Sequence, residues 1–268
     1  MAVVSKDINY TTKDGDVLAC LASPKESGKL PGVVLIHEIF GLDNHIRDVA
    51  KRIAAEGYIV IAPHLFSSRR FSETLSSENI SEAMRFMFSI PIDKQRDGEY
   101  RKEQLNRLDA KKRDVVVGVN SILFENRPID IFTDYLSSAV DYLHGLDNFN
   151  GKVGSVGFCF GGGMSINLGC TGKTDTCVIF YGENPNPIDK ISGLKGSVMG
   201  LYGGEDTRIN SHIDELVGAL AKHKIPFTIR VFKGAHHAFF NDTRSQGYNR
   251  EAAEAAWSML INLFKSTL

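Results

Sequence analysis

The segment GFCFG at residues 157–161 limits the possible fold of this chain more than any other stretch. It ends an apolar run, KVGSVGF, with the composition of a buried strand, and it leads into a run of glycines that opens a helix. A strand that turns this sharply into a helix leaves no space for side chains two positions before and after the turn residue. The pattern therefore predicts a nucleophile elbow, in which Cys159 faces the positive end of a helix that favours its thiolate form.

Two alternatives would also account for this loop. A phosphate-binding Walker loop needs Lys and then Ser or Thr after its last glycine, whereas Met164 follows Gly163. A cysteine at a tight turn can equally be a small core residue, which is the usual role of a free cysteine. Residues elsewhere in the chain therefore have to decide between catalysis and core packing.

The rest of the chain alternates apolar runs with amphipathic stretches, which predicts a mostly parallel sheet covered by helices on both faces. The first two segments, 3–11 and 16–22, are instead expected to form an antiparallel hairpin that turns at residues 14–15. With 268 residues, of which 43% are hydrophobic, the chain can build one sizeable core, so we expect a single α/β domain over residues 1–268. Further strands are expected at 31–37, 58–62, 152–158, 176–181, 197–202 and 227–232, and helices at 43–56, 211–223 and 250–265.

A helix-rich, charged stretch at about residues 66–130 interrupts this alternation. Its pattern predicts helices at 73–88 and 99–124, and then a helix at 130–144 that rejoins the core. We expect the first two helices to form a lid-like insertion over the active end of the sheet, within the same domain.

Candidate partners for Cys159 follow two later strands. Asp206 comes directly after one predicted strand, where parallel sheets gather functional groups, although it could also cap the next helix. Glu205 is the competing carboxylate. His236 and His237 follow the next strand, and one of them would take the thiol proton while the acid holds its ring. The order nucleophile, acid, histidine is that of α/β-hydrolases, and it favours this fold.

The segment HEIFG at 37–41 ends the first predicted parallel strand. It begins like the zinc motif H-E-x-x-H, but Gly41 stands where the second histidine is needed, so no metal site is expected. The segment suits an oxyanion loop instead, in which the backbone N–H groups of Ile39 and Phe160 bind the charge that develops on a carbonyl oxygen. Glu38, an acid beside an apolar strand end, is either a structural hydrogen-bond partner or a perturbed catalytic group.

Composition argues against several other classes of protein. The 31 basic and 32 acidic residues nearly cancel, so no overall field favours nucleic acid or an anionic membrane as a partner. We see no stretch with the pattern of a signal peptide or a membrane span. The four cysteines, at 20, 159, 170 and 177, form no CxxC pair and no regular framework, so we expect reduced thiols and a cytoplasmic location.

Four segments together resemble the dienelactone hydrolase family, a branch of the α/β-hydrolases. They are HEIFG at 37–41, GFCFGG at 157–162, GGEDTRI at 203–209 and GAHHAFFND at 234–242. The tail YNREAAEAAW at 248–257 is also similar to the closing helix of the family. The resemblance covers most of the chain except the insertion, and a cysteine elbow combined with an HEIFG loop is far more specific than either motif alone.

The resemblance implies a triad of Cys159, Asp206 and His237, because the family pattern reads G-A-x-H-x-F. It also implies that Glu38 contacts the nucleophile and helps to generate its thiolate when substrate arrives. The implied reaction is hydrolysis of a small lactone or carboxylic ester through an acyl-thioester, with no metal and no organic cofactor.

Two departures from the family concern the substrate. Members that act on dienelactone hold its carboxylate with arginines, at positions that here align with Ser68 and Asn241. Arg69, Phe66 and Phe239 are the residues that we expect to bind substrate. Dienelactone and a more general carboxylic ester are therefore both open as substrates.

Two further functions stay open on the sequence alone. A thiol redox or acyl-transfer protein would need a resolving cysteine, for which Cys170 and Cys177 are the candidates. A hydrolase fold kept only as a binding module predicts a broken triad, whereas candidates for nucleophile, acid and histidine are all present. The oligomeric state, monomer or homodimer, is left open.

Overall fold

The computed structural model describes residues 1–25, 28–94 and 97–268. Within them, eight strands form one sheet in the order β1-β2-β4-β3-β5-β6-β7-β8. The strands are β1 (Val3–Thr12), β2 (Gly15–Pro24), β3 (Leu30–Ile36), β4 (Ile59–Pro63), β5 (Phe149–Phe158), β6 (Thr176–Phe180), β7 (Ser197–Gly203) and β8 (Phe227–Phe232).

Strand direction divides this sheet into two parts. β1 and β2 form the predicted antiparallel hairpin, and β2 also pairs antiparallel with β4. From β4 through β3 and on to β8, every neighbouring pair is parallel. The predicted α/β-hydrolase sheet is therefore confirmed. The carboxyl ends of its parallel strands open along one edge, where sheets of this kind bind their ligands.

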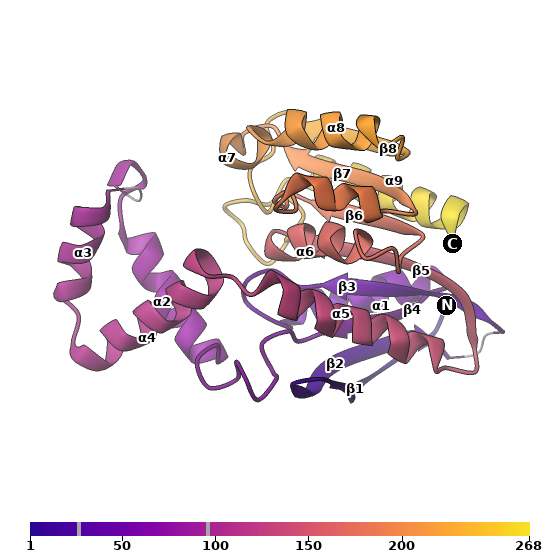
Figure 1. Ribbon diagram of the computed structural model, residues 1–268, viewed down its shortest axis with the longest axis horizontal. Helices are drawn as coiled ribbons and strands as arrows, with labels where there is room; N and C mark the ends of the chain where they lie inside the picture. Colours follow the sequence, from indigo (N-terminus) through magenta and orange to yellow (C-terminus); the bar gives the residue numbers. More distant parts are fainter. Residues whose placement is uncertain (26–27, 95–96) are drawn as a thin grey trace.

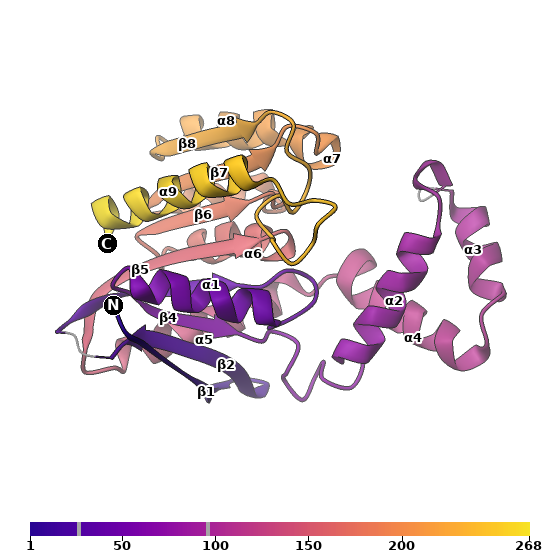
Figure 2. The ribbon, with the colours of Figure 1, turned by 180° about the vertical axis from the view of Figure 1, so that it is seen from behind.

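Helices cover both faces of the sheet, as predicted (Figures 1 and 2). α1 (Asn44–Ala55) and α9 (Arg250–Thr267) lie on one face, and α5 (Ile129–His144), α6 (Phe160–Gly169) and α8 (Ile213–Lys222) on the other. β4 and β6 are buried along their whole length between these layers, which suits their unbroken apolar sequences. Among the described residues, no helix combines the length and the apolar composition that crossing a membrane requires.

Local sequence marks where α1 and α9 begin. Asp43 accepts from the N–H of Ile46 at 2.9 Å, and Asn249 accepts from the N–H of Ala252 at 3.1 Å. Each side chain satisfies an N–H group that the first turn of a helix leaves unpaired. After α1 the chain turns at Gly57, whose φ of 104° is rarely reached by other residues. The predicted boundaries of these two helices, 43–56 and 250–265, therefore agree with the structure to within two residues.

The insertion projects away from the body of the molecule, beyond the carboxyl ends of the parallel strands (Figure 1). It contains α2 (Ser77–Ser89), α3 (Gly98–Asn106) and α4 (Ala110–Asn120), and α4 continues into a π-helical turn over Ser121–Glu125. The prediction of one helix over 99–124 is wrong, because α3 ends and α4 starts anew. Asp109 causes the break, since its side chain accepts from the N–H of Lys112 at 2.9 Å and caps a second helix.

Aromatic side chains join the root of the insertion to the body. Phe71 packs on Phe132 of α5 with ring centroids 5.0 Å apart, and Phe132 packs on Phe160 at 5.6 Å. None of the nine residues of α3 is buried, and α3 lies far from this attachment in both views (Figures 1 and 2). The insertion is therefore anchored at one end, next to the residue that follows Cys159. Its role as a lid stays a prediction.

Candidate active site

Cys159 occupies the turn between β5 and α6 in a conformation that few residues adopt. Its φ is 54° and its ψ −115°, and its N–H donates to the carbonyl of Phe180 at 3.0 Å. A Cβ at Gly157 would lie 1.9 Å from the carbonyl oxygen of Gly161, and a Cβ at Gly161 would lie 2.3 Å from that of Ile36. Both glycines of the elbow are therefore required by close backbone contacts, and the residue between them is strained.

Asp206 and His237 meet at the carboxyl ends of β7 and β8. His237 Nδ1–H donates to Asp206 Oδ2 at 2.5 Å. Asp206 Oδ1 accepts from the N–H of Ile209 at 3.4 Å and so caps the short helix α7 (Thr207–Asn210). The two roles that the sequence left open for Asp206, acid and helix cap, thus belong to the two oxygens of one carboxylate.

The competing carboxylate and histidine lie outside this pair. Glu205 accepts from the backbone N–H of Gly234 at 3.2 Å, and His236 is exposed. The side chain of His237 is 32% exposed and that of Asp206 only 8%. The structure thus pairs a shielded acid with a histidine that can still reach solvent and substrate.

The charge on Cys159 affects the protonation of His237. Burial by itself lowers the pKa of the imidazole. The negative charge of the Cys159 thiolate raises the pKa, and hydrogen bonds to Asp206 and Cys159 raise it further, to about 10. Because Nδ1 is bonded to Asp206, Nε2 is the nitrogen left for the sulfur. The imidazole of His237 is therefore favoured in its protonated form at neutral pH.

Ser68 and Asn241 stand at the two positions that align with the substrate-binding arginines of dienelactone hydrolases. Neither side chain brings a positive charge to this site. Ser68 is fully buried and accepts from the hydroxyl of Tyr135 at 3.2 Å. Asn241 is also fully buried; its Nδ2 donates to Glu38 Oε2 at 2.8 Å, and its Oδ1 accepts from the N–H of Thr243 at 3.1 Å. Glu38 Oε1 is buried and has no hydrogen-bond partner within the described residues. One oxygen of Glu38 is therefore fixed, and the other is available to a thiol, a water or a substrate.

Tyr181 is a site residue that the sequence interpretation missed. It follows β6 directly with a φ of 41°, and its ring centroid lies 5.0 Å from that of His237. Burial raises the pKa of its phenol well above the usual value, and the charges of Glu38 and Cys159 raise it further. Its position at a strand end was the available signal, because Asp206 and His237 were found by the same rule.

The two predicted oxyanion donors come from segments that touch. Phe160 is the first residue of α6, and the first N–H groups of a helix have no partner inside it. Ile39 lies in the turn that follows β3. A Cβ at Gly161 would be 2.6 Å from the carbonyl oxygen of His37, so the chain enters this turn in contact with the first turn of α6.

Two of the residues expected to bind substrate, Phe66 and Phe239, are buried in the core. Phe66 is 1% exposed and packs on Phe160 at 5.8 Å between ring centroids. Phe239 is 0% exposed and packs on Tyr181 at 5.4 Å. Both support the site from behind and offer no surface to a substrate, because strand-end aromatic residues fill the core under the open edge. Arg69 is exposed on the segment between β4 and α2.

A cation that the sequence interpretation missed lies beside the elbow. The guanidinium carbon of Arg127 is 5.6 Å from the ring centroid of Phe160, and the group donates to Glu183 at 2.8 Å. Arg208 donates to the other oxygen of Glu183 at 2.6 Å. Burial opposes, but the two guanidinium groups together lower, the pKa of Glu183. Two positive groups thus share one negative group, which leaves positive charge in excess.

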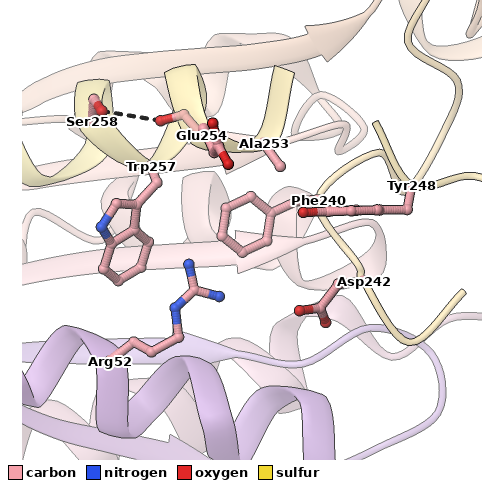
Figure 3. Close-up of a pocket in the computed structure, with 8 residues that line it drawn as sticks. All are labelled: Arg52, Phe240, Asp242, Tyr248, Ala253, Glu254, Trp257 and Ser258. Atoms are coloured by element: carbon pink, nitrogen blue, oxygen red, sulfur yellow. Dashed lines mark hydrogen bonds between the residues drawn. The ribbon is translucent and has the colours of Figure 1, made fainter. Parts of the chain in front are cut away.

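A separate hollow of about 240 Å³ opens between α1 and α9 (Figure 3). Arg52 reaches across it from α1, with its guanidinium carbon 4.4 Å from the ring centroid of Trp257. The hollow is walled by these two helices and the loop that follows β8, and none of the predicted catalytic residues lines it. Within the described residues, no group of three or more His, Cys, Asp or Glu side chains gathers as a metal site would require.

The candidate resolving cysteines lie at the far end of α6. Cys159 precedes the first residue of this helix and Cys170 follows its last, so ten helical residues separate them by about 15 Å. Cys177 Sγ lies beside Gly169, at the same far end. Disulfide formation needs Cα atoms within about 7 Å, so this arrangement removes the basis for a redox pair with Cys159.

Comparison with known proteins places the chain in a family. The model described as "Dienelactone hydrolase family" matches residues 17–268. The chain belongs to the dienelactone hydrolase family. It is 36% identical over 262 residues to the "Putative carboxymethylenebutenolidase" of Saccharolobus solfataricus, and the match covers 98% of each chain. It is 32% identical over 262 residues to the protein of the same name from Synechocystis sp., covering 92% of this chain and 91% of that one.

Solved structures agree at the level of the fold. The "Putative Dienelactone Hydrolase" of Klebsiella pneumoniae subsp. pneumoniae MGH 78578 superposes with a TM-score of 0.75 at 23% identity, over 99% of both chains. The dienelactone hydrolase of Anabaena variabilis ATCC 29413 gives a TM-score of 0.66 at 14% identity, over 100% of both chains. The resemblance drawn from four short segments is thereby confirmed, and the chain is a hydrolase that acts on ester bonds.

Replacing Gly161 by alanine tests the close contact at the elbow. The new Cβ would meet backbone oxygen atoms at 2.3 and 2.6 Å, so we expect Gly161→Ala to lower the free energy of unfolding by about 3 kcal/mol or more. Gly218→Ala is the matched control, because Gly218 is exposed inside α8 and its Cβ would meet nothing within 4 Å. That change should raise stability by up to about 1 kcal/mol. Urea denaturation measures both, and a Gly161→Ala protein as stable as wild type would contradict the contact.

The raised pKa of His237 predicts how the site responds to pH. Below a pH of about 6.5 a histidine is protonated in the folded and the unfolded chain alike, whereas His237 keeps its proton in the folded chain up to about 10. The stabilisation from this proton is therefore fully present below about 6.5 and is lost as pH rises through about 10. Nitrogen chemical shifts of the imidazole should show an imidazolium at a pH of about 8.

Cys159→Ala supplies the matched comparison for this titration. It removes the negative charge and one hydrogen bond that raise the pKa of His237, so the pKa should fall. Cys170→Ala changes a cysteine at the other end of α6 and should leave the titration as it is. If the His237 titration were the same in Cys159→Ala and wild type, the pairing with the thiolate would be disproved.

Proposed function

We propose that this protein hydrolyses small lactones or carboxylic esters, with Cys159 as the nucleophile and His237 and Asp206 as its partners. One observation carries the proposal. The imidazole of His237 is hydrogen-bonded to Asp206 at 2.5 Å, and the charge of Cys159 raises the pKa of the same imidazole. A nucleophile, a proton carrier and an acid that orients it are what covalent ester hydrolysis requires.

Acylation begins when the Cys159 thiolate attacks the carbonyl carbon of the substrate and an electron pair moves to the carbonyl oxygen. The tetrahedral intermediate collapses, the C–O bond of the ester breaks, and His237 gives its proton to the departing alkoxide. An open ester releases the alcohol at this point. A lactone keeps it tethered to the acyl-thioester.

In deacylation His237 acts as a base, whereas in acylation it acts as an acid. Neutral His237 takes a proton from water, and the water oxygen attacks the thioester carbonyl. Collapse of this second intermediate releases the carboxylic acid and restores the thiolate beside the imidazolium. Asp206 holds the ring of His237 in the working tautomer throughout.

The backbone N–H groups of Phe160 and Ile39 stabilise the oxygen that becomes negative in each intermediate. Donors that are already oriented stabilise such charge without reorganisation during the reaction. The contact between His37 and Gly161 supports this role, because it brings the loop that leads to Ile39 against the start of α6.

Glu38 assists formation of the thiolate in this proposal. Asn241 holds one of its oxygens, and the other is buried without a partner among the described residues. A buried polar atom without a hydrogen bond costs free energy, and a hydrogen bond from the Cys159 thiol would remove that cost. Transfer of the proton from this thiol to His237 then gives the thiolate from which acylation begins.

The excess positive charge beside Phe160 favours esters and lactones that carry a carboxylate. Arg127 brings a guanidinium to the start of α6 from the exit of the insertion. It thus takes over the charge that neither Ser68 nor Asn241 provides. The insertion, which this arginine joins to Glu183, is in the right place to close over such a substrate as a lid.

A binding module that retains the hydrolase fold is the alternative. Such a module has no need for a residue held at a φ of 54° between two glycines that admit no side chain. Backbone strain of this kind is usually kept where a reaction depends on it. The strained elbow, together with the His237–Asp206 bond, favours the enzyme.

Turnover of p-nitrophenyl acetate by Cys159→Ala tests the proposal. Loss of the nucleophile should lower kcat by about 1,000-fold or more, because no other group can form the acyl intermediate. Cys170→Ala is the control and should keep wild-type turnover. Mass spectrometry of the wild type quenched early should find the acetyl group on the peptide that contains Cys159. Turnover that survives in Cys159→Ala would eliminate this nucleophile, and an inert wild type would favour the binding module.

The role of Arg127 can be measured with two esters of similar size, p-nitrophenyl hemisuccinate and p-nitrophenyl butyrate. Arg127→Gln should lower kcat/KM for the charged ester about 10-fold relative to the neutral one, since a charge-assisted hydrogen bond is lost. Arg85→Gln serves as the control, because Arg85 lies on α2 and pairs with Glu82. An unchanged ratio between the two esters in Arg127→Gln would rule out this contact.

A further inference from the structure

His37 is a fully buried histidine to which the proposed reaction assigns no role. Its ring packs against Phe66 and Phe160, with centroids 4.8 and 5.9 Å away, so no substrate reaches it. Burial, together with the neighbouring His64, lowers the pKa of its imidazole to about 3, and the ring is therefore neutral at working pH. A buried neutral imidazole can still fix the groups to which its two nitrogens are bonded.

The bonds of His37 define which of its nitrogens carries the proton. Nε2 accepts from the backbone N–H of Leu65 at 3.1 Å, so Nδ1 is the protonated nitrogen and donates to the carbonyl oxygen of Glu38 at 2.5 Å. The N–H of Gly41 donates to the same oxygen at 3.3 Å. Two donors therefore hold the carbonyl of Glu38 in one direction.

The peptide group between Glu38 and Ile39 links the hydrogen bond of the Glu38 carbonyl to the direction of the Ile39 N–H. In a planar trans peptide the C=O and the N–H point in opposite directions. Since the Glu38 carbonyl is drawn toward the His37 ring, the Ile39 N–H points away from that buried ring. The loop starts against the elbow, because the carbonyl oxygen of His37 would be 2.6 Å from a Cβ at Gly161.

We infer that His37 is a positioning residue, whose Nδ1–H holds the peptide between residues 38 and 39 in the orientation that presents the Ile39 N–H to the oxyanion. The inference rests on the proposed function, because an oxyanion forms only if Cys159 attacks a carbonyl. His37 touches no reacting atom and acts through the peptide alone. Without its bond the peptide can rotate, and the N–H then has to be reoriented while charge develops.

Two variants separate the bonds of His37. In His37→Asn the side-chain amide nitrogen takes the place of Nδ1 and can still donate to Glu38, while the bond with Leu65 is lost. In His37→Gln the amide reaches the place of Nε2 and can still accept from Leu65, while the bond to Glu38 is lost. We expect a fall of about 10- to 100-fold in the acylation rate with p-nitrophenyl acetate for His37→Gln and a much smaller one for His37→Asn.

Replacing a merely structural residue would slow acylation and would also slow the alkylation of Cys159 by iodoacetamide. The rate of alkylation is therefore the readout that separates a structural role from a positioning role. Alkylation displaces iodide at a saturated carbon and forms no oxyanion, so its rate should be the same in wild type and both variants. Equal losses of acylation in the two variants, or a loss of alkylation parallel to that of acylation, would overturn the inference.

The wild-type protein supplies a test that does not depend on the folding of a variant. Nitrogen-edited NMR should show His37 as the neutral tautomer with the proton on Nδ1, in slow exchange with water; a proton on Nε2 would refute the inference. If wild type turns over esters and Cys159→Ala does not, while the His37 variants behave alike, this inference fails alone. If wild type is inert, the proposed function fails and this inference fails with it.

Discussion

The contact between the end of β3 and the first turn of α6 is the constraint on which the rest of the site depends. Backbone meets backbone there, with no space for even one methyl group at Gly161. This contact places the loop of residues 37–41 beside the strained Cys159 and so joins two segments that are more than a hundred residues apart. Because a packed core deforms little, the relative position of Cys159 and the loop of residues 37–41 is set when the sheet forms.

Two histidines near the elbow, His37 and His237, differ in protonation because their burial and their neighbouring charges differ. His37 has no carboxylate bonded to its ring, and burial keeps it neutral, so it can serve as a fixed hydrogen-bond donor. His237 is also shielded, but the charges of Cys159 and Asp206 outweigh the loss of hydration and keep it protonated. The same type of side chain is thus a neutral hydrogen-bond donor at His37 and a charged group at His237, because the neighbours of the two rings differ.

Much of this arrangement could be predicted from the sequence, because it depends on backbone rules that short segments carry. The elbow, the strand ends that precede Asp206 and His237, and the alternation of strands with helices follow from glycine spacing and apolar runs. The helix break at Asp109 was missed, since a cap inside an amphipathic stretch competes with continuation of the helix on nearly equal terms. The burial of Phe66 and Phe239 depends on packing between distant segments, and no local pattern reports it.

Arg127 shows most clearly where sequence reasoning ends. It stands at the exit of the insertion, and only the fold brings it to Phe160 and Glu183. The backbone contact at Gly161 admits no variation, whereas a side chain that arrives from an insertion can be exchanged without disturbing the elbow. The groups that would carry out the reaction are therefore fixed by close packing in the body. The groups that would choose the substrate come from a segment attached at one end, through the aromatic contacts of Phe132.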